Sequence, residues 1–157
     1  MTNDGQNPTK AALRAGETIP VAEINRTAST FVVEAIALAG FKCVWVDTEH
    51  SHIDLGDLSN LILAARAHDI DLVVRLAHGP YNQILRPLEL GADGLIWPHC
   101  KSAEEARTFV HAAKFRPLGL RGMGGGRDSQ FGREPKSEYL DRANQNTLLG
   151  VMIEDAE

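Results

Sequence analysis

Short apolar runs alternate with longer amphipathic segments along most of the chain. The apolar runs predict strands at residues 19–24, 43–46, 72–74, 94–97 and 148–153. Segments with helical spacing predict helices at residues 8–15, 30–39, 55–68, 80–90, 102–113 and 136–144. Because the strands are continuously apolar, they are expected to be buried on both faces of a parallel sheet. The order of the elements therefore indicates an α/β fold.

Residues with known preferences for helix ends mark several of these boundaries. Ser29 and Ser102 are expected to cap the helices that follow them. Ser102 and Glu105 also have the spacing of a capping box, in which each side chain bonds the backbone N–H of the other residue. Gly16 and Gly40 are expected to end the helices that precede them.

The spacing between successive strands separates two α/β architectures. Each strand–helix unit takes about 32 residues, and eight such units would give roughly the 250 residues of a (β/α)8 barrel. A flavodoxin-like, doubly wound sheet would fit 157 residues by itself, but no covering helix follows the last predicted strand. We therefore expect residues 10–157 to be the N-terminal part of one (β/α)8 TIM-type barrel, with about its first five strands. Residues 1–9 are expected to form a flexible tail.

Composition and charge narrow the class of protein. The chain has 16 Lys and Arg against 21 Asp and Glu, a net charge of −5, and no basic stripe that would bind nucleic acid. No apolar run approaches the roughly 18–20 residues that span a membrane, and the N-terminus lacks the apolar core of a signal peptide. Cys43 and Cys100 lie in separate apolar runs and are expected to be buried free thiols. These features predict a cytoplasmic protein.

Ionisable residues gather where the predicted strands end, whereas the strand bodies carry almost none. The groups are Asp47-Thr48-Glu49-His50, Arg75, Trp97-Pro98-His99 and Glu154-Asp155. In parallel α/β folds, binding and catalysis take place beyond the carboxyl ends of the strands. These groups are therefore expected to converge on one rim of the sheet.

Asp47, Glu49 and His50 form the densest of these groups. Histidine transfers protons near neutral pH, and a neighbouring carboxylate can orient its ring and raise its pKa. The structural alternative is that Asp47 caps the next helix and His50 is a solvated loop residue. His50 and His52 also resemble a two-histidine metal pair, but no Cys or further His lies at ligand spacing.

Arg75 and Glu154 each suggest a role in binding. The Arg75 guanidinium could bind a carboxylate or stabilise an enolate oxygen, or it could form a structural ion pair with a carboxylate on the rim. Glu154 offers oxygen donors of the kind that Mg²⁺ and Mn²⁺ prefer, although one carboxylate does not make a site. His99 and the two cysteines are interpreted as packing or rim residues.

A glycine-rich stretch covers residues 119–127. It lacks the Lys-Ser/Thr pair of a Walker phosphate loop, and it follows a helix rather than the strand that a dinucleotide-binding fingerprint needs. We interpret it as a mobile loop between a helix and a strand, in a position where it could meet a neighbouring subunit.

Six segments between residues 47 and 154 carry motifs of a known family, and the resemblance spans roughly residues 8–157. They are Asp47-Thr-Glu-His50, Val74-Arg75, Leu90-Gly-Ala-Asp-Gly-Leu-Ile-Trp-Pro98, Ser102-Ala-Glu-Glu-Ala106, Pro117-Leu-Gly-Leu-Arg-Gly122 and Val151-Met-Ile-Glu154. With these motifs the chain resembles the HpcH/HpaI aldolase family, metal-dependent (class II) pyruvate aldolases of the citrate-lyase and phosphoenolpyruvate/pyruvate barrel group.

This resemblance implies a fold, a cofactor and a reaction. The fold would be a (β/α)8 barrel of the phosphoenolpyruvate/pyruvate group. A divalent cation, Mg²⁺ or Mn²⁺ with Co²⁺ as a further option, would be held by Glu154 and by an Asp expected beyond the end of this chain. The reaction would be reversible cleavage of a 4-hydroxy-2-oxo acid to pyruvate and an aldehyde, through a pyruvate enolate that the metal stabilises.

The resemblance also implies roles for individual residues. Arg75 would steady the keto or enolate oxygen, and His50, oriented by Asp47, would move the proton to or from the aldol hydroxyl. Glu49 would support the rim network around the substrate. Met152, where many relatives have Gln, would border the substrate. Complete relatives form hexamers built from trimers, so a homo-oligomer is expected.

Two alternatives remain open from the sequence. A related lyase on the same barrel could act on oxaloacetate or on an acyl-CoA thioester. A chain with five strands and one metal carboxylate could also be an inactive half-barrel that serves as an assembly partner.

Overall fold

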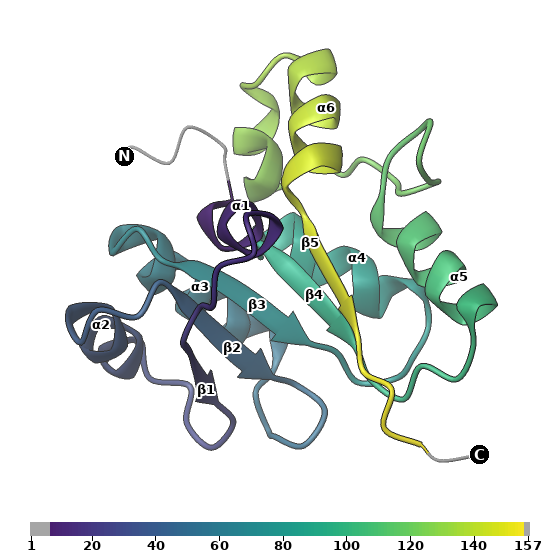
Figure 1. Cartoon of the computed structure of the whole chain (residues 1–157). Helices are drawn as coiled ribbons and strands as arrows, with labels where there is room; N and C mark the ends of the chain where they lie inside the picture. Colours follow the sequence, from purple (N-terminus) through teal and green to yellow (C-terminus); the bar gives the residue numbers. More distant parts are fainter. Residues whose placement is uncertain (1–6, 156–157) are drawn as a thin grey trace.

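The computed structural model describes residues 7–155 and contains a five-stranded parallel sheet with helices packed on it (Figure 1). The strands are β1 (Val21–Ile24), β2 (Cys43–Asp47), β3 (Asp71–Arg75), β4 (Gly94–Trp97) and β5 (Leu148–Val151). The helices are α1 (Pro8–Arg14), α2 (Thr30–Leu38), α3 (Leu55–Ala67), α4 (Tyr81–Leu90), α5 (Ala103–Ala113), the 3₁₀ helix η1 (Arg127–Gly132) and α6 (Lys136–Asn146). Each predicted strand and helix is present, with boundaries that differ by a few residues.

The strands lie side by side in chain order, β1-β2-β3-β4-β5, and each neighbouring pair is parallel. A flavodoxin-like sheet would place its second strand outside the first and so reverse the order at one point. An order without reversal is that of successive βα units in a (β/α)8 barrel. The structure is therefore part of such a barrel, as expected, and the doubly wound alternative is wrong.

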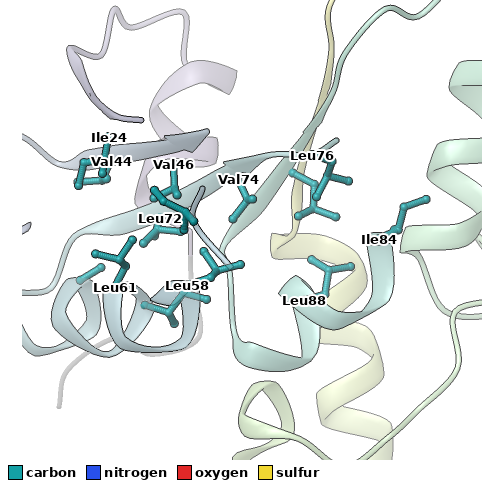
Figure 2. Packing of buried hydrophobic residues seen from close by; sticks show 14 of the residues in the cluster. Ile24, Val44, Val46, Leu58, Leu61, Leu72, Val74, Leu76, Ile84 and Leu88 are labelled. Atoms are coloured by element: carbon teal, nitrogen blue, oxygen red, sulfur yellow. The ribbon is translucent and has the colours of Figure 1, made fainter. Parts of the chain in front are cut away.

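The main hydrophobic core lies between the sheet and the helices that cover it (Figure 2). Four fully buried residues of β2 and β3 point into this layer: Val44, Val46, Leu72 and Val74. Because successive side chains of a strand point to opposite faces, Asp47 and Arg75 belong to the other face of the sheet. The apolar layer thus leaves the polar strand ends free to form a separate cluster.

Helix α1 is anchored at the amino ends of β3 and β4. The amide Nδ2 of Asn7 donates to the carbonyl oxygen of Asp93 at 2.8 Å, and the Thr9 N–H donates to Asp71 Oδ2 at 2.8 Å. Both Asn7 and Thr9 are buried. The prediction of a flexible tail over residues 1–9 is therefore wrong for residues 7–9, and residues 1–6 lie outside the described residues.

The predicted helix caps are only partly correct. Ser102 accepts from the Glu105 N–H at 3.1 Å, as expected. The Glu105 carboxylate instead accepts from Trp97 Nε1 at 2.8 Å and from the Lys101 N–H at 3.0 Å, so the reciprocal half of the capping box is wrong. Ser29 precedes α2 but makes no side-chain cap bond.

The glycine-rich stretch passes close to α4 and to the end of α5. A Cβ atom at Gly119 would lie 2.3 Å from the Lys114 carbonyl oxygen, and one at Gly126 would lie 2.7 Å from the Glu89 carbonyl oxygen. Arg127 then donates to backbone carbonyls in α3 and α4. At Gly119 and Gly126 the backbone therefore packs directly against other backbone, and these contacts and Arg127 hold the stretch against the helices.

Two expectations from composition can be compared with the structure. Cys43 and Cys100 are buried free thiols, as predicted, and burial raises the pKa of Cys43 to about 12. Within residues 7–155, no helix has the length and apolar character needed to cross a bilayer.

Candidate functional site

Asp47 and Arg75 face each other at the carboxyl ends of β2 and β3. The parallel register pairs these two residues directly. Arg75 donates from Nε to Asp47 Oδ1 at 3.0 Å and from Nη2 to Asp47 Oδ2. The Asp47 side chain is 1% exposed and that of Arg75 is 13% exposed. The two residues therefore form a bidentate ion pair with little access to water.

Burial and hydrogen bonding have opposite effects on the pKa of Asp47. Burial alone would raise the pKa of this carboxyl, but hydrogen bonds from Arg75 and from the N–H groups of Glu49 and His50 outweigh burial and lower the pKa. The bond to Asp47 correspondingly raises the pKa of Arg75. Both side chains are thus charged at neutral pH.

The same carboxylate shapes the turn that follows β2. Asp47 Oδ1 accepts from the Glu49 N–H at 2.8 Å and from the His50 N–H at 3.3 Å. Ser51 Oγ donates to the Asp47 carbonyl oxygen at 2.5 Å. Helix α3 is capped by Asp54 instead, so the interpretation of Asp47 as a helix cap is wrong.

The His50 ring lies beside Glu49 and not beside Asp47. His50 Nε2 is 3.6 Å from Glu49 Oε2, and the ring is 67% exposed. The expectation that Asp47 orients this ring is wrong, because both oxygens of Asp47 are occupied by Arg75 and the backbone. Asp47 places His50 only through the backbone of the turn.

The Glu49 carboxylate lies close to nitrogen atoms of three side chains, Arg75, His50 and His99. Its Oε2 atom lies 3.5 Å from Arg75 Nη1 and 3.6 Å from His50 Nε2, and its Oε1 atom lies 3.3 Å from His99 Nε2. The Glu49 side chain is 12% exposed. Within the described residues, the buried Oε2 atom has no hydrogen-bond partner. This buried oxygen therefore has an unused capacity to accept a hydrogen bond.

His99 connects the Glu49 group to the end of β5, a role beyond the packing or rim position expected from the sequence. Its Nδ1 atom is 3.3 Å from Asp155 Oδ1, and its backbone N–H donates to Glu154 Oε1 at 3.0 Å. The bond to Asp155, together with the nearby Glu154 and Glu49 carboxylates, raises the pKa of His99. A histidine two residues after the end of an apolar strand was the available signal for this role.

Glu154 and Met152 are brought to the rim by pairing of the chain after β5 with the end of β4. The Met152 N–H donates to the Trp97 carbonyl oxygen at 2.9 Å, and the Cys100 N–H donates to the Met152 carbonyl oxygen at 2.8 Å. The Glu154 side chain follows, partly exposed, beside His99. Within residues 7–155, no group of three or more His, Cys, Asp or Glu side chains is arranged to bind a metal ion. His50 and His52 are therefore not part of such a group.

A second polar group lies next to His99 and was not predicted. His78 Nε2 lies 3.2 Å from the Pro98 carbonyl oxygen and 3.3 Å from Glu105 Oε1. The His78 ring also packs on Trp97, with ring centroids 4.4 Å apart. Its position between β3 and α4 gives no periodicity or motif by which the sequence would have identified it.

The amino-acid sequence of the chain matches a family model and is similar to the sequences of two aldolases. The model of the family described as HpcH/HpaI aldolase/citrate lyase matches residues 26–157. A 2-keto-3-deoxy-L-rhamnonate aldolase from Salmonella gallinarum is 33% identical over 150 residues, which are 94% of this chain and 55% of that protein. A 4-hydroxy-2-oxovalerate aldolase from Rhodococcus jostii is 35% identical over 127 residues, which are 80% of this chain and 48% of that protein.

Two solved structures have a similar fold over most of this chain. The crystal structure of an HpcH/HpaI aldolase from Desulfitobacterium hafniense DCB-2 matches with a TM-score of 0.84 and 29% identity, over 94% of this chain and 57% of that one. The crystal structure of the citrate synthase SbnG matches with a TM-score of 0.82 and 31% identity, over 93% of this chain and 55% of that one. The chain spans about half the length of the curated relatives it matches.

Proposed function

Because the chain belongs to the HpcH/HpaI aldolase/citrate lyase family, we propose that the protein is a divalent-metal-dependent aldolase. It would cleave a 4-hydroxy-2-oxo acid reversibly to pyruvate and an aldehyde. The observation that carries this proposal is the Arg75–Asp47 ion pair at the strand ends, which holds a guanidinium beside Glu49, the neighbour of the His50 ring. Two relatives with names of 2-oxo acid aldolases support the reaction class.

Arg75 would bind the oxygen on which negative charge develops. Asp47 occupies the Nε and Nη2 atoms of Arg75, while Nη1 faces Glu49 at 3.5 Å. A guanidinium fixed in this way needs little rearrangement to donate a further hydrogen bond to a 2-oxo or enolate oxygen. Arg75 would thus lower the barrier of the cleavage step and bind the substrate.

His50 would transfer the proton of the aldol hydroxyl. Its ring is exposed on the rim, where a substrate could reach it, and Glu49 lies next to it. In the cleavage direction, His50 would accept the hydroxyl proton as the carbon–carbon bond breaks. In the reverse reaction, aldol addition, His50 would return that proton to the new hydroxyl oxygen.

Among the residues that the structure describes, Glu154 is the one that would hold the divalent cation. Its partly exposed carboxylate supplies oxygen donors of the type that Mg²⁺, Mn²⁺ and Co²⁺ accept, as one ligand of a larger set. When bound, the cation would draw electron density from the 2-oxo carbonyl. Met152, two residues earlier, would border the substrate with an apolar thioether.

Pyruvate release tests the proposal. The protein is incubated with 4-hydroxy-2-oxovalerate or a longer 4-hydroxy-2-oxo acid, and pyruvate is detected through lactate dehydrogenase. We expect release with Mg²⁺, Mn²⁺ or Co²⁺, its loss with EDTA, and its return when metal is added back. Absence of pyruvate with all of these substrates and metals would overturn the aldolase proposal, and release that survives EDTA would overturn the metal dependence.

A related lyase reaction is the second candidate function. The family includes citrate lyases by its description, and one structural neighbour is a citrate synthase by its title. Turnover of oxaloacetate or of an acyl-CoA thioester that exceeds turnover of the 4-hydroxy-2-oxo acids would favour this candidate.

We also propose that the protein assembles as a homo-oligomer of the hexamer type. Large apolar side chains remain exposed in this chain, and a second copy could cover them; they include Phe31, Leu38, Leu118 and Phe131. Sedimentation velocity tests this assembly, and a monomer at micromolar concentration would contradict it.

A further inference from the structure

We propose that His99 is a positioning residue that holds the Glu49 carboxylate so that its second oxygen faces Arg75 and His50. The positional part of this inference rests on geometry, and its kinetic part rests on the proposed aldol cleavage. His99 itself does not need to contact the substrate.

The contacts of Glu49 show what His99 contributes. The two oxygens of the carboxylate have different partners: Oε1 lies 3.3 Å from His99 Nε2, whereas Oε2 lies 3.5 Å from Arg75 and 3.6 Å from His50. A Glu side chain has several rotatable bonds, and its terminal torsion has no sharp preference. A contact on Oε1 therefore determines where the unpartnered Oε2 atom points.

Three hydrogen bonds hold His99 and the residue that follows it. Its Nδ1 atom bonds Asp155 at 3.3 Å, and its backbone N–H bonds Glu154 at 3.0 Å. The next residue, Cys100, donates its N–H to Met152 at 2.8 Å. These bonds keep the ring between the Glu49 group and the end of β5.

The backbone of His99 supports a specific role for this residue. Its φ angle is 50°, in the left-handed region that costs a residue with a Cβ atom roughly 1 kcal/mol. The side chain is 40% exposed, so it does not serve to fill the core. A strained and partly exposed residue persists where its surroundings determine its conformation.

Three substitutions of His99 separate the contact of Nε2 with Glu49 from the contact of Nδ1 with Asp155. His99→Gln can place an amide nitrogen near the position of Nε2 and so keep the contact with Glu49. His99→Asn places an amide nitrogen near the position of Nδ1, which faces Asp155, and Asn tolerates left-handed backbone. His99→Gly keeps the backbone conformation without strain and removes the ring. The matched control is His111→Gln, an exposed histidine on α5.

Crystal structures and steady-state kinetics of these variants test the inference. In His99→Gly and His99→Asn, we expect the Glu49 carboxylate to leave its position beside Arg75, and kcat/KM for pyruvate release to fall about 10- to 100-fold, mostly through kcat. His99→Gln is expected to keep the Glu49 conformer and to stay within about threefold of the wild type, as is His111→Gln.

Two outcomes would overturn the inference. The first is that the Glu49 carboxylate keeps its conformer in His99→Gly. The second is that the wild type is active and both His99→Gly and His99→Gln have the same kcat/KM as the wild type. A wild type that releases no pyruvate would contradict the proposed function instead. In that case the crystal structures still decide whether His99 positions Glu49.

Discussion

Arg75 donates through Nε and Nη2 to the two carboxylate oxygens of Asp47, its register partner on the neighbouring strand. One of these oxygens also accepts the N–H groups of Glu49 and His50. A single buried carboxylate thus fixes both a guanidinium and the turn that carries the proposed proton-transfer residue. A change at this position is expected to disturb both parts of the site.

Asp47→Asn is expected to lower kcat/KM for pyruvate release by about 100-fold. The Asn side chain keeps one carbonyl oxygen for the backbone N–H groups, but its amide N–H groups oppose the donors of Arg75. Loss of a hydrogen bond to a charged group should also lower the free energy of unfolding by about 2 kcal/mol. Kinetics and urea unfolding measure the two effects, and an active variant with wild-type stability would contradict the role of the ion pair.

The pH dependence of unfolding gives an independent check on the Asp47 charge. Because the folded protein lowers the pKa of Asp47 below the ordinary value of 3.8, the charge stabilises the fold above about pH 4, and this stabilisation is lost as pH falls further. Between pH 5 and pH 3, the wild type should therefore lose more stability than Asp47→Asn. The control Asp141→Asn, at an exposed position on α6, should follow the wild type.

Glu154→Gln is expected to weaken Mn²⁺ binding at least about tenfold. Loss of residues that merely support metal ligands typically costs 10- to 100-fold in affinity, and loss of a charged ligand should cost no less. Electron paramagnetic resonance of free Mn²⁺ measures the affinity without any turnover. Glu104→Gln, an exposed change on α5, is the matched control. Equal Mn²⁺ affinities in the two variants would exclude Glu154 as a ligand.

Much of the fold could be predicted from the sequence because the buried strands are short apolar runs at a regular spacing. The same reasoning failed at residues 7–9, where a polar segment is buried. Asn7 and Thr9 are ordered by Asp93 and Asp71, residues distant in the chain, and such pairing leaves no periodic signal. Local polarity therefore indicated a flexible tail, whereas tertiary contacts fix these residues at the start of the predicted helix.

The site was predictable as a set of strand ends but not as a network. Asp47 and Arg75 were identified individually, but their ion pair depends on the register between β2 and β3, which the sequence does not contain. The same ion pair removed Asp47 as a partner for the His50 ring. The position of His99 between Glu49 and the end of β5 depends on a left-handed residue after Pro98 that no motif indicated.

The glycine-rich stretch offers a test of packing that does not involve activity. In Gly119→Ala, the new Cβ atom would lie 2.3 Å from the Lys114 carbonyl oxygen, so backbone has to move, and we expect a loss of about 2–3 kcal/mol in the free energy of unfolding. In Gly124→Ala, the nearest atom is Oε1 of the flexible Glu89 side chain, and the loss should stay below about 1 kcal/mol. Urea unfolding distinguishes the two, and a larger loss in Gly124→Ala would contradict this view of the loop.

Asp93 is expected to make the protein less stable as pH rises towards neutrality. Removal of its carboxyl from water, together with the nearby Asp71 carboxylate, raises the pKa of Asp93 from 3.8 to about 7. Between about pH 4 and pH 7, the folded protein keeps a proton on Asp93 that the unfolded chain releases, so this contribution to stability is lost as pH rises through that window. Asp93→Asn stays neutral at every pH, and its carbonyl oxygen can still accept the Leu72 N–H.

Urea unfolding at pH 5 and at pH 8 measures this effect as a difference between two proteins. On moving to pH 8, the wild type should lose about 2 kcal/mol more than Asp93→Asn does. Asp69→Asn is the control, since Asp69 is exposed and has a left-handed φ angle of 53° that Asn accommodates. Identical pH profiles for the wild type and Asp93→Asn would mean that Asp93 is charged in the folded protein at pH 5. The Asp93 carboxylate, which accepts the Leu72 N–H, would then be a second negative charge near Asp71 at the amino ends of β3 and β4.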